Sequence, residues 1–409
     1  MLTNWGGNHT YRASAVARPS TLSELQQLIA ESAELSVVGT RHSFNAIGDG
    51  AALVDLSVLA SPPIVDIERG VVSVGGSTTY AELSETLARH GRALHNLASL
   101  PHISVAGAIA TGTHGSGSRL GNLATAVESI EMITAAGEVV HFHRGDDDFD
   151  GAVVHLGALG LVIRVGLRVE ETYDVEQTVY DELSWSTLTA SFDEVFESAT
   201  SVSVFTRWGS SAGELWCKQR ADARPRTAIT DELRPAETQR HPIPDMETSA
   251  CTPQRSEPGP WWNRLPHFRA DAEPSAGAEI QSEFFVDRTV SSAAIEAIRT
   301  IGPLLDDVLL VSEIRTIAAD DLWMSPCHGR DSTAFHFTWR RDPGAVEQAV
   351  DQVAAVLEPF GARPHWGKVF PSSWRPGERY ERWGDFLNLR DRLDPQRRMT
   401  TPWFERHLG

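Results

Sequence analysis

The chain has 409 residues and carries 55 acidic against 36 basic side chains, with three cysteines. Its length indicates roughly two or three domains, each large enough to bury a core. The formal net charge of −19 argues against a protein that binds nucleic acid or an anionic membrane surface, because both need a basic face. The few, widely spaced cysteines exclude a disulfide scaffold and a CxxC metal or redox site.

No targeting or membrane segment is expected. The first residues have neither a basic start nor an apolar core, so they do not predict a signal peptide. The most apolar stretch, residues 153–169, is too short to cross a bilayer. We therefore expect a soluble, cytoplasmic protein. Almost all of its basic residues are arginine, and the only lysines are Lys218 and Lys368.

Strands and helices alternate through the N-terminal part of the chain. Residues 21–24 and 79–82 are capping boxes that predict two helix starts, and Gly91 is a natural end for the second helix. Apolar runs at 35–39 and 71–76 predict short strands. This order predicts an α+β or α/β fold.

A glycine-rich segment follows at residues 100–125, where five glycines stand among Ser, Thr and Ala with almost no charge. Backbone that approaches a ligand closely is the usual reason for such a segment. Beyond it we expect strands at 130–134 and 139–143. Residues 156–163 form another small-residue segment that leads into a strand.

The pattern changes near residue 172. Residues 222–276 hold nine of the 22 prolines, too many for an ordinary connection. This segment is either a disordered linker or, as its aromatic residues favour, an extended segment packed on a surface. We then expect strands at 280–286, 308–314 and 333–339 and a helix at 343–357.

Most familiar catalytic motifs are absent. The chain has no P-loop, no HExxH and no nucleophile elbow after a strand. His141 and His143 share one face of an expected strand, but without nearby carboxylates or cysteines they are a poor metal site, so no metal is predicted. Residues 146–148, all Asp, are interpreted as a solvated turn.

Two segments have the composition of a nucleotide-binding site. Residues 38–45 place a glycine turn straight after a strand, with His42 at its tip. This is either a tight turn before a helix or a phosphate cradle built from backbone N–H groups. Residues 99–107, continuing into 111–115, have enough small and hydroxyl side chains to surround a pyrophosphate and a flat ring.

Together with residues 159–162, these segments resemble the FAD-binding domain of the vanillyl-alcohol oxidase superfamily. More narrowly, the chain resembles the alditol and xylitol oxidases, which are related to the sugar-1,4-lactone oxidases. In the C-terminal half, residues 313–316, 336–339 and 363–370 carry the resemblance, and residues 258–261 and 265–270 favour the alditol branch. The resemblance covers essentially the whole chain, and the motifs follow one another in the same order as in the family.

The resemblance implies a two-domain α+β flavoprotein. An FAD-binding domain of two α+β subdomains would span residues 1–172 and be completed by 371–409, and residues 173–370 would form a cap with a large antiparallel sheet flanked by helices. His42 matches the histidine that bonds covalently to the flavin, although Arg41 departs from the glycine often seen before it. The implied cofactor-binding residues are Val38, Gly39, Thr40, Arg41, His42, Ser43, Ser99, Ser104, Gly107, Thr111, Gly112, Thr113, His114, Val162 and His365.

The resemblance also implies the substrate site. The matching positions are Ser99, Glu313, Arg315, His336, Thr338 and Lys368. Glu313 and Arg315 are two residues apart, so in a strand they face the same side, although such a pair can also be purely structural. We expect Lys368 to act as the base, Arg315 to stabilise the developing alkoxide, and Glu313 to orient both the hydroxyl and Lys368. Ala98 matches a small residue that leaves room for dioxygen at the flavin.

The implied activity is oxidation of the terminal hydroxyl of an alditol, such as xylitol or sorbitol, to the aldose. Hydride would pass to flavin N5, and O2 would reoxidise the flavin to give H2O2. The expected partners are a polyol and O2, without nucleic acid or membrane, and the protein is expected to be a monomer. The alternative is a sugar-1,4-lactone oxidase or dehydrogenase of the same fold. A further alternative is a protein that binds flavin but catalyses no reaction. A nicotinamide dehydrogenase is disfavoured, because no GxGxxG opens a helix after the first strand.

Overall fold

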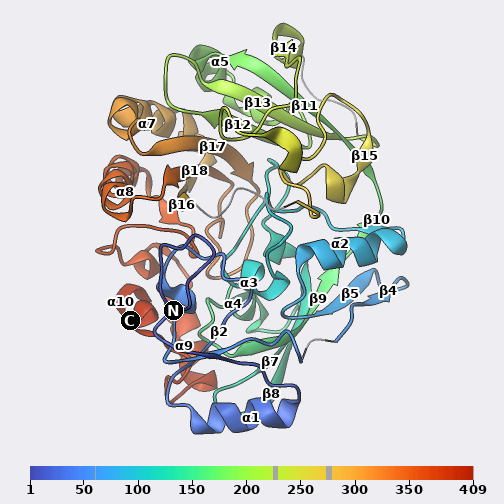
Figure 1. Ribbon diagram of the computed structural model, residues 1–409, viewed down its shortest axis with the longest axis vertical. Helices are drawn as coiled ribbons and strands as arrows, with labels where there is room; N and C mark the ends of the chain where they lie inside the picture. The colour runs from blue at the N-terminus through green and yellow to red at the C-terminus, as the bar shows by residue number, and fades with distance from the viewer. Residues whose placement is uncertain (60, 224–228, 273–278, 409) are drawn as a thin grey trace.

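The computed structural model describes residues 1–59, 61–223, 229–272 and 279–408, and most of its strands belong to two sheets, one above the other in Figure 1. The antiparallel lower sheet runs in the order β4 (Ile64–Asp66), β5 (Val71–Gly75), β9 (Leu161–Arg168), β7 (Val127–Ile133) and β8 (Val139–His143). Beside it lie the parallel strands β1 (Val16–Ala17), β3 (Ala52–Val54) and β2 (Leu35–Val37), and the pair β6 (Arg92–Ala93) and β10 (Glu170–Glu171). The strands expected from the sequence here are present.

Two helices around the lower sheet begin where the sequence predicts, α1 (Leu22–Glu31) and α2 (Tyr80–Arg89). The helices α3 (Val105–Ala110) and α4 (Phe149–Val153) and the 3-10 turns η1 (Ala46–Gly48) and η2 (Leu123–Ala126) were not predicted. Thr79 and Glu82 form a complete capping box at α2, and Gly91 has φ +65° just beyond its end. At α1 only half of the box forms, because the Glu24 carboxylate accepts from the backbone N–H of Ser20 instead of that of Thr21.

The upper sheet is large and antiparallel. Its order is β14 (Arg234–Pro235), β11 (Asp174–Leu183), β13 (Gly213–Arg220), β12 (Ser201–Thr206), β17 (Leu309–Ile317), β18 (Ser332–Arg340), β16 (Glu279–Asp287) and β19 (Arg363–Pro364), with β15 (Gly259–Pro260) also on β11. The three strands expected from residue 280 onward became β16, β17 and β18. From the sequence, no bounds were predicted for the strands between residues 174 and 220.

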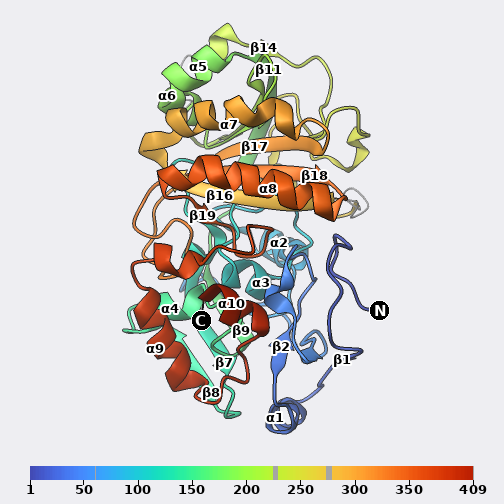
Figure 2. The same cartoon turned by 90° about the vertical axis from the view of Figure 1, so that its left-hand side faces the viewer.

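Helices cover one face of the upper sheet (Figure 2). They are α5 (Trp185–Ala190), α6 (Phe192–Phe196), α7 (Ser291–Leu305) and α8 (Pro343–Leu357), and α8 has the predicted bounds. Strand β18 shows why the sheet is two-sided: Phe335, Phe337 and Trp339 belong to the main hydrophobic core, whereas His336 and Thr338 alternate with them and face the opposite side. That opposite face looks towards the lower sheet.

The end of the chain returns to the lower half through η8 (Pro376–Arg379), α9 (Trp383–Leu393) and α10 (Pro402–Leu408). The Leu35 amide N–H donates to the Arg398 carbonyl oxygen at 2.8 Å, and Met399 packs in a core cluster with residues of α1 and β2. The boundaries at residues 172/173 and 370/371 remain predictions.

Much of the proline-rich segment packs on the upper sheet as an extended chain. Its described part contains β14 and β15 with the turns η3 (Ile229–Glu232), η4 (Thr248–Ala250) and η5 (Trp261–Asn263), and the Trp261 side chain is fully buried. Residues 224–228 and 273–276 of this segment lie outside the described residues. The remaining 3-10 turns are η6 (Arg288–Val290) and η7 (Glu358–Phe360). In the described ranges, no helix is long and apolar enough to cross a membrane.

Candidate active site

A cavity between the two sheets collects the residues that the sequence singled out. Its wall includes Val38, Gly39, Thr40, Arg41, His42, Ser43, Ala98, Ser99, Ser104, Gly107, Thr111, Thr113, His114, Val162, Glu313, Arg315, His336, Thr338, His365 and Lys368. Gly112 is the one predicted residue that does not line it; its φ is +67°, and a Cβ there would lie 2.8 Å from Pro326. Gly112 therefore serves the local turn.

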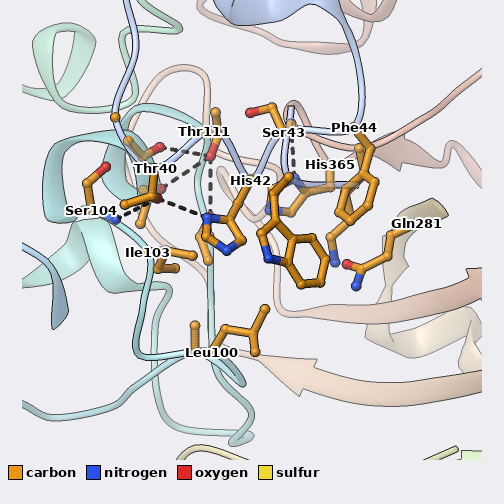
Figure 3. A pocket seen from close by; sticks show the side chains of 18 of the residues that line it. Thr40, His42, Ser43, Phe44, Leu100, Ile103, Ser104, Thr111, Gln281 and His365 are labelled. Carbon is orange, nitrogen blue, oxygen red and sulfur yellow. Dashed lines mark hydrogen bonds between the residues drawn. The ribbon is translucent and has the colours of Figure 1, made fainter. Parts of the chain in front are cut away.

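The loop that carries His42 forms one wall (Figure 3). His42 Nδ1 lies 2.9 Å from Thr40 Oγ1, and the imidazole stacks on Trp5 with ring centroids 5.1 Å apart. Burial lowers the pKa of His42 to about 4, so the imidazole is neutral at neutral pH. Arg41 adopts φ +60°, a conformation that favours glycine, and its exposed side chain donates to the Thr3 carbonyl oxygen.

Glycines on this wall let neighbouring segments approach one another closely. A Cβ at Gly76 would lie 2.3 Å from the Val162 carbonyl oxygen, and one at Gly39 would lie 2.3 Å from Ser104 Oγ. Gly107 approaches the same hydroxyl, with a Cβ position 2.8 Å away. The cavity lining combines these glycines with the hydroxyls of Thr40, Ser104 and Thr111, and such a combination suits a flat ring and a pyrophosphate. The wall therefore fits the FAD that the resemblance implies.

The roof of the cavity comes from the upper sheet and contains two charged pairs. In the first pair, Lys368 Nζ donates to Glu283 Oε2 at 2.8 Å and lies 3.4 Å from His336 Nδ1. Glu283 and His336 are direct cross-strand neighbours on β16 and β18. Burial lowers the pKa of Lys368, although Glu283 opposes that shift. Burial alone would raise the pKa of Glu283, but Lys368 and the nearby histidines outweigh it and hold that pKa well below its usual range.

The His114 ring lies beside the second oxygen of Glu283. His114 Nδ1 lies 2.7 Å from the Gly115 carbonyl oxygen, which can only accept, so Nδ1 carries a hydrogen. His114 Nε2 lies 3.2 Å from Glu283 Oε1. The buried Glu283 carboxylate thus has Lys368 beside Oε2 and the His114 ring beside Oε1, and both neighbours help to hold its pKa well below the usual range.

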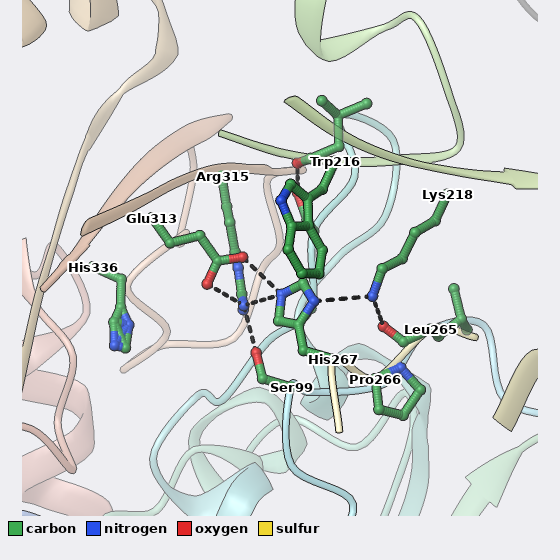
Figure 4. Close-up of polar contacts among 12 residues, drawn as sticks. Ser99, Trp216, Lys218, Leu265, Pro266, His267, Glu313, Arg315 and His336 are labelled. Carbon is green, nitrogen blue, oxygen red and sulfur yellow. Dashed lines mark hydrogen bonds and ion pairs between the residues drawn. The ribbon is translucent and has the colours of Figure 1, made fainter. Parts of the chain in front are cut away.

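The second charged pair lies on β17 (Figure 4). The Arg315 guanidinium donates to Glu313 Oε2 and to Ser99 Oγ, and His267 Nε2 lies 2.9 Å from Glu313 Oε1. Glu313 and Arg315 are about 5 % and 6 % exposed. Burial would raise the pKa of Glu313, but Arg315 and His267 outweigh it and keep that pKa well below its usual range. Glu313 is therefore a carboxylate that accepts hydrogen bonds.

One expected contact is wrong. The sequence interpretation had Glu313 orient Lys368, but the carboxylate partner of Lys368 is Glu283. The reason is register: Glu313, His336 and Glu283 are successive cross-strand neighbours on β17, β18 and β16, so His336 separates the two carboxylates. Thr338 Oγ1 lies 3.4 Å from His336 Nε2.

Sequence reasoning missed Glu283, His267 and Trp5. Alternation within the expected strand 280–286 placed Glu283 on the same face as Gln281, which could have marked it as facing the cavity. His267 lies in the 265–270 segment that helped to carry the resemblance, but no spacing links it to Glu313. His365 lines the cavity and lies between His114 and Phe285, and its contact with the flavin stays a prediction. Among the described residues, no group of three or more His, Cys, Asp or Glu side chains could hold a metal ion.

The fold and this cavity define an FAD-dependent oxidoreductase of the vanillyl-alcohol oxidase type. An FAD-binding-domain family model matches residues 13–143, and a D-arabinono-1,4-lactone oxidase family model matches residues 280–407. A cholesterol oxidase structure from B. sterolicum superposes with TM-score 0.78 at 14% identity, covering 100% of this chain and 96% of that one. This likeness supports the fold.

Sequence comparison narrows the class. The chain is 43% identical to an alditol oxidase from a Streptomyces species, over 98% of this chain and 97% of the relative. It is 27% identical to L-gulono-1,4-lactone dehydrogenase from Mycobacterium tuberculosis, over 100% of this chain and 99% of that protein. It is 24% identical to L-gulonolactone oxidase from Mus musculus, over 96% and 94%. The protein belongs to the alditol oxidase family, and the predicted family and FAD cofactor are confirmed.

Proposed function

We propose that this protein oxidises the terminal hydroxyl of an alditol such as xylitol or sorbitol to the aldehyde of an aldose, with one O2 reduced to H2O2 per turnover. The observation that carries the proposal is the roof of the cavity. It pairs each of two carboxylates with a basic side chain, Glu283 with Lys368 and Glu313 with Arg315. Such a surface offers many donors and acceptors without excess charge, which suits a substrate that has many hydroxyls and no charge.

Each roof residue has a role set by its protonation state. Lys368 is the base for the hydroxyl proton, because burial lowers the pKa of its amine. Arg315 keeps its charge and stabilises the developing alkoxide. Glu313 has a donor on each oxygen and stays ionised, so it orients a substrate hydroxyl and does not take the proton. Ser99, His336 and Thr338 supply further hydrogen-bonding groups to the polyol.

FAD, when bound, supplies a hydride acceptor for the carbinol carbon and passes the electrons to O2. The residues that hold it are those of the His42 loop, the glycine-rich wall and His365. His42 is the attachment point for a covalent bond, because a neutral imidazole has a nucleophilic nitrogen. Ala98 lines the cavity with a small side chain, and it leaves room for dioxygen.

A sugar-1,4-lactone is the second candidate substrate, because gulonolactone dehydrogenases and oxidases also match nearly the whole chain. A lactone ring is uncharged too, so the balanced roof does not exclude it. The greater identity to the alditol oxidase favours the alditol.

The sequence also predicts a monomer. Light scattering tests this prediction, because a monomer should have the chain mass of 44.8 kDa.

The first experiment is a visible spectrum of the purified protein, followed by acid precipitation. Yellow colour that stays with the pellet supports the covalent bond, and its loss from a His42→Ala variant assigns the bond to His42. Anaerobic xylitol should then bleach the flavin, and air should restore it with one H2O2 formed. Bleaching by L-gulono-1,4-lactone and not by any alditol would replace the alditol with the lactone.

Lys368→Met tests the base. A variant that retains its flavin should reduce it at least 100-fold more slowly with xylitol, within the range of general-base effects of about 10² to 10⁴. A normal reduction rate in flavin-loaded Lys368→Met would remove Lys368 from the mechanism.

A further inference from the structure

We infer that Lys218 and His267 form a positioning pair that holds Glu313 as an ionised acceptor for a substrate hydroxyl. Neither residue was assigned a role from the sequence. Lys218 lies on β13, two strands away from Glu313 across the sheet, and it does not line the cavity. It therefore acts through another side chain, and His267 stands between them (Figure 4). The inference rests on the proposed function only where it concerns the substrate.

The Lys218 amine fixes one nitrogen of His267 as an acceptor. Lys218 Nζ donates to the Leu265 carbonyl oxygen and lies 3.2 Å from His267 Nδ1. An ammonium group has hydrogens only to donate. Burial lowers the pKa of Lys218 to about 7, so the ammonium form is still present at neutral pH, and in that form His267 Nδ1 accepts. A neutral amine keeps two N–H groups and can make the same two contacts, although its lone pair no longer forbids the reverse direction.

The second nitrogen of His267 must then be the donor. Burial lowers the pKa of His267 to about 3, so the ring is neutral and carries a single N–H. With Nδ1 accepting from Lys218, that hydrogen is on Nε2, 2.9 Å from Glu313 Oε1. The Phe205 and Trp216 rings, with centroids 5.3 and 5.4 Å from that of His267, hold the imidazole in place.

Arg315 does not take over this role. Its terminal nitrogen lies 3.1 Å from His267 Nε2. Because a guanidinium only donates, it can bond to Nε2 only when Nε2 carries no hydrogen, and the ionised Glu313 Oε1 at 2.9 Å disfavours that tautomer. The Arg315 hydrogens are directed to Glu313 Oε2 and Ser99 Oγ. Glu313 thus receives one donor on each oxygen, and the donor on Oε1 exists only while His267 keeps its hydrogen on Nε2.

Removal of the Lys218 amine releases the tautomer. The His267 hydrogen can then move to Nδ1, and the Nε2 lone pair would face the Oε1 lone pairs of Glu313 across 2.9 Å. The carboxylate must turn away or take up a proton to relieve that contact. Either change misplaces the hydroxyl that Glu313 orients, whereas Lys368 keeps its own partner Glu283.

The tautomer can be measured without turnover. The protein labelled with ¹⁵N-histidine gives separate long-range correlations for its 15 histidines, and the one lost in a His267→Gln variant assigns His267. We expect a protonated Nε2 and an unprotonated, hydrogen-bonded Nδ1 in the wild type, and a mixture or the opposite tautomer in Lys218→Met. A protonated Nδ1 in the wild type, or an unchanged tautomer in Lys218→Met, would overturn the proposal.

Substrate affinity supplies the second measurement. Rapid mixing with xylitol should show an apparent dissociation constant about tenfold higher in Lys218→Met, with the limiting rate of flavin reduction within about threefold of the wild type. Gln177→Met is the matched control, because Gln177 is the cross-strand neighbour of Lys218 and bonds to the Thr252 and Pro253 carbonyl oxygens but not to His267.

The control separates positioning from stability. Both variants lose buried hydrogen bonds and should lose similar stability to heat, but only Lys218→Met should change the tautomer and the dissociation constant. Equal weakening of xylitol binding in both variants would overturn the inference. If no alditol reduces the wild-type flavin, the proposed function fails, and the tautomer measurement still decides whether the pair exists.

Discussion

Asn45 and Lys368, 323 residues apart, are joined by a hydrogen bond of 2.7 Å from the Asn45 side-chain amide to the Lys368 carbonyl oxygen. The same amide donates to the Trp366 carbonyl oxygen at 2.8 Å, and the Phe44 N–H donates to that of Gly367. The loop that carries His42 is thereby tied to the segment that carries Lys368. These hydrogen bonds therefore fix the position of His42, the proposed flavin attachment, relative to Lys368, the proposed base.

Asn45→Ala should therefore separate flavin binding from flavin reduction. Loss of these two bonds, and of the cap in which Asn45 Oδ1 accepts from the Ile47 N–H, should cost about 2–4 kcal/mol of unfolding free energy, and flavin reduction by xylitol should slow while FAD content is retained. Asn8→Ala is the control, since Asn8 donates to the Phe44 carbonyl oxygen but does not contact the Lys368 segment. An Asn45→Ala protein as fast as the control would show that this tie does not position the base.

Glu283→Gln should move the pH dependence of flavin reduction. Burial lowers the pKa of Lys368, and Glu283 opposes that shift. Removing the carboxylate leaves burial unopposed, so the pKa of Lys368 falls further. Since the base acts in its neutral form, the limb on which the rate rises with pH should move to lower pH. Stopped-flow reduction across the pH range measures this limb, and a shift to higher pH would contradict the assignment.

Gly76→Ala should damage the cofactor wall. The added Cβ would lie 2.3 Å from the Val162 carbonyl oxygen, and main chain cannot rotate aside as a side chain can. We expect lower FAD content and a loss of about 1–3 kcal/mol of stability. Gly384→Ala, at the start of α9 with no atom within 4 Å of the new Cβ, is the control and should fold at least as well. A Gly76→Ala protein with the wild-type FAD content would show that the segment after β5 can move away from β9 without loss of the cofactor site.

Arg41→Gly should leave flavin attachment intact. The φ of +60° costs an arginine free energy that glycine avoids, while glycine loses more entropy on folding, so stability should change by about 1 kcal/mol or less. Arg41→Val removes the same guanidinium but cannot adopt this φ easily, and it should lower both stability and covalent flavin. The bound fraction after acid precipitation measures the difference. Loss of attachment in both variants would assign the effect to the guanidinium instead.

Local signals predicted the elements well where a few neighbouring residues determine the structure. Thr79 with Glu82 marked the start of α2, and periodic apolar residues marked α8 at Pro343–Leu357. The glycine-rich wall and His42 were found because loops that approach a cofactor have an unusual composition. At α1, by contrast, the Ser20 amide competed successfully for the Glu24 carboxylate.

The partners within the site could not be predicted in the same way. Glu283 meets Lys368 because β16 pairs with β18 and because Asn45 places the 366–368 segment. His267 reaches Glu313 because the proline-rich segment folds back across a face of the upper sheet, where Lys218 on β13 contacts it. These contacts depend on strand order and long-range register, which no spacing in the sequence encodes.

The position of the two lysines has a chemical consequence for an enzyme that releases sugars. Aldoses condense with free amines, and both lysine amines of this chain are engaged beneath the upper sheet, Lys218 with the Leu265 carbonyl oxygen and Lys368 with Glu283. The outer surface carries arginine in their place. Prolonged incubation with concentrated aldose should therefore leave the outer side chains free of glycation by mass spectrometry and confine any lysine adduct to Lys368, whose amine lines the cavity.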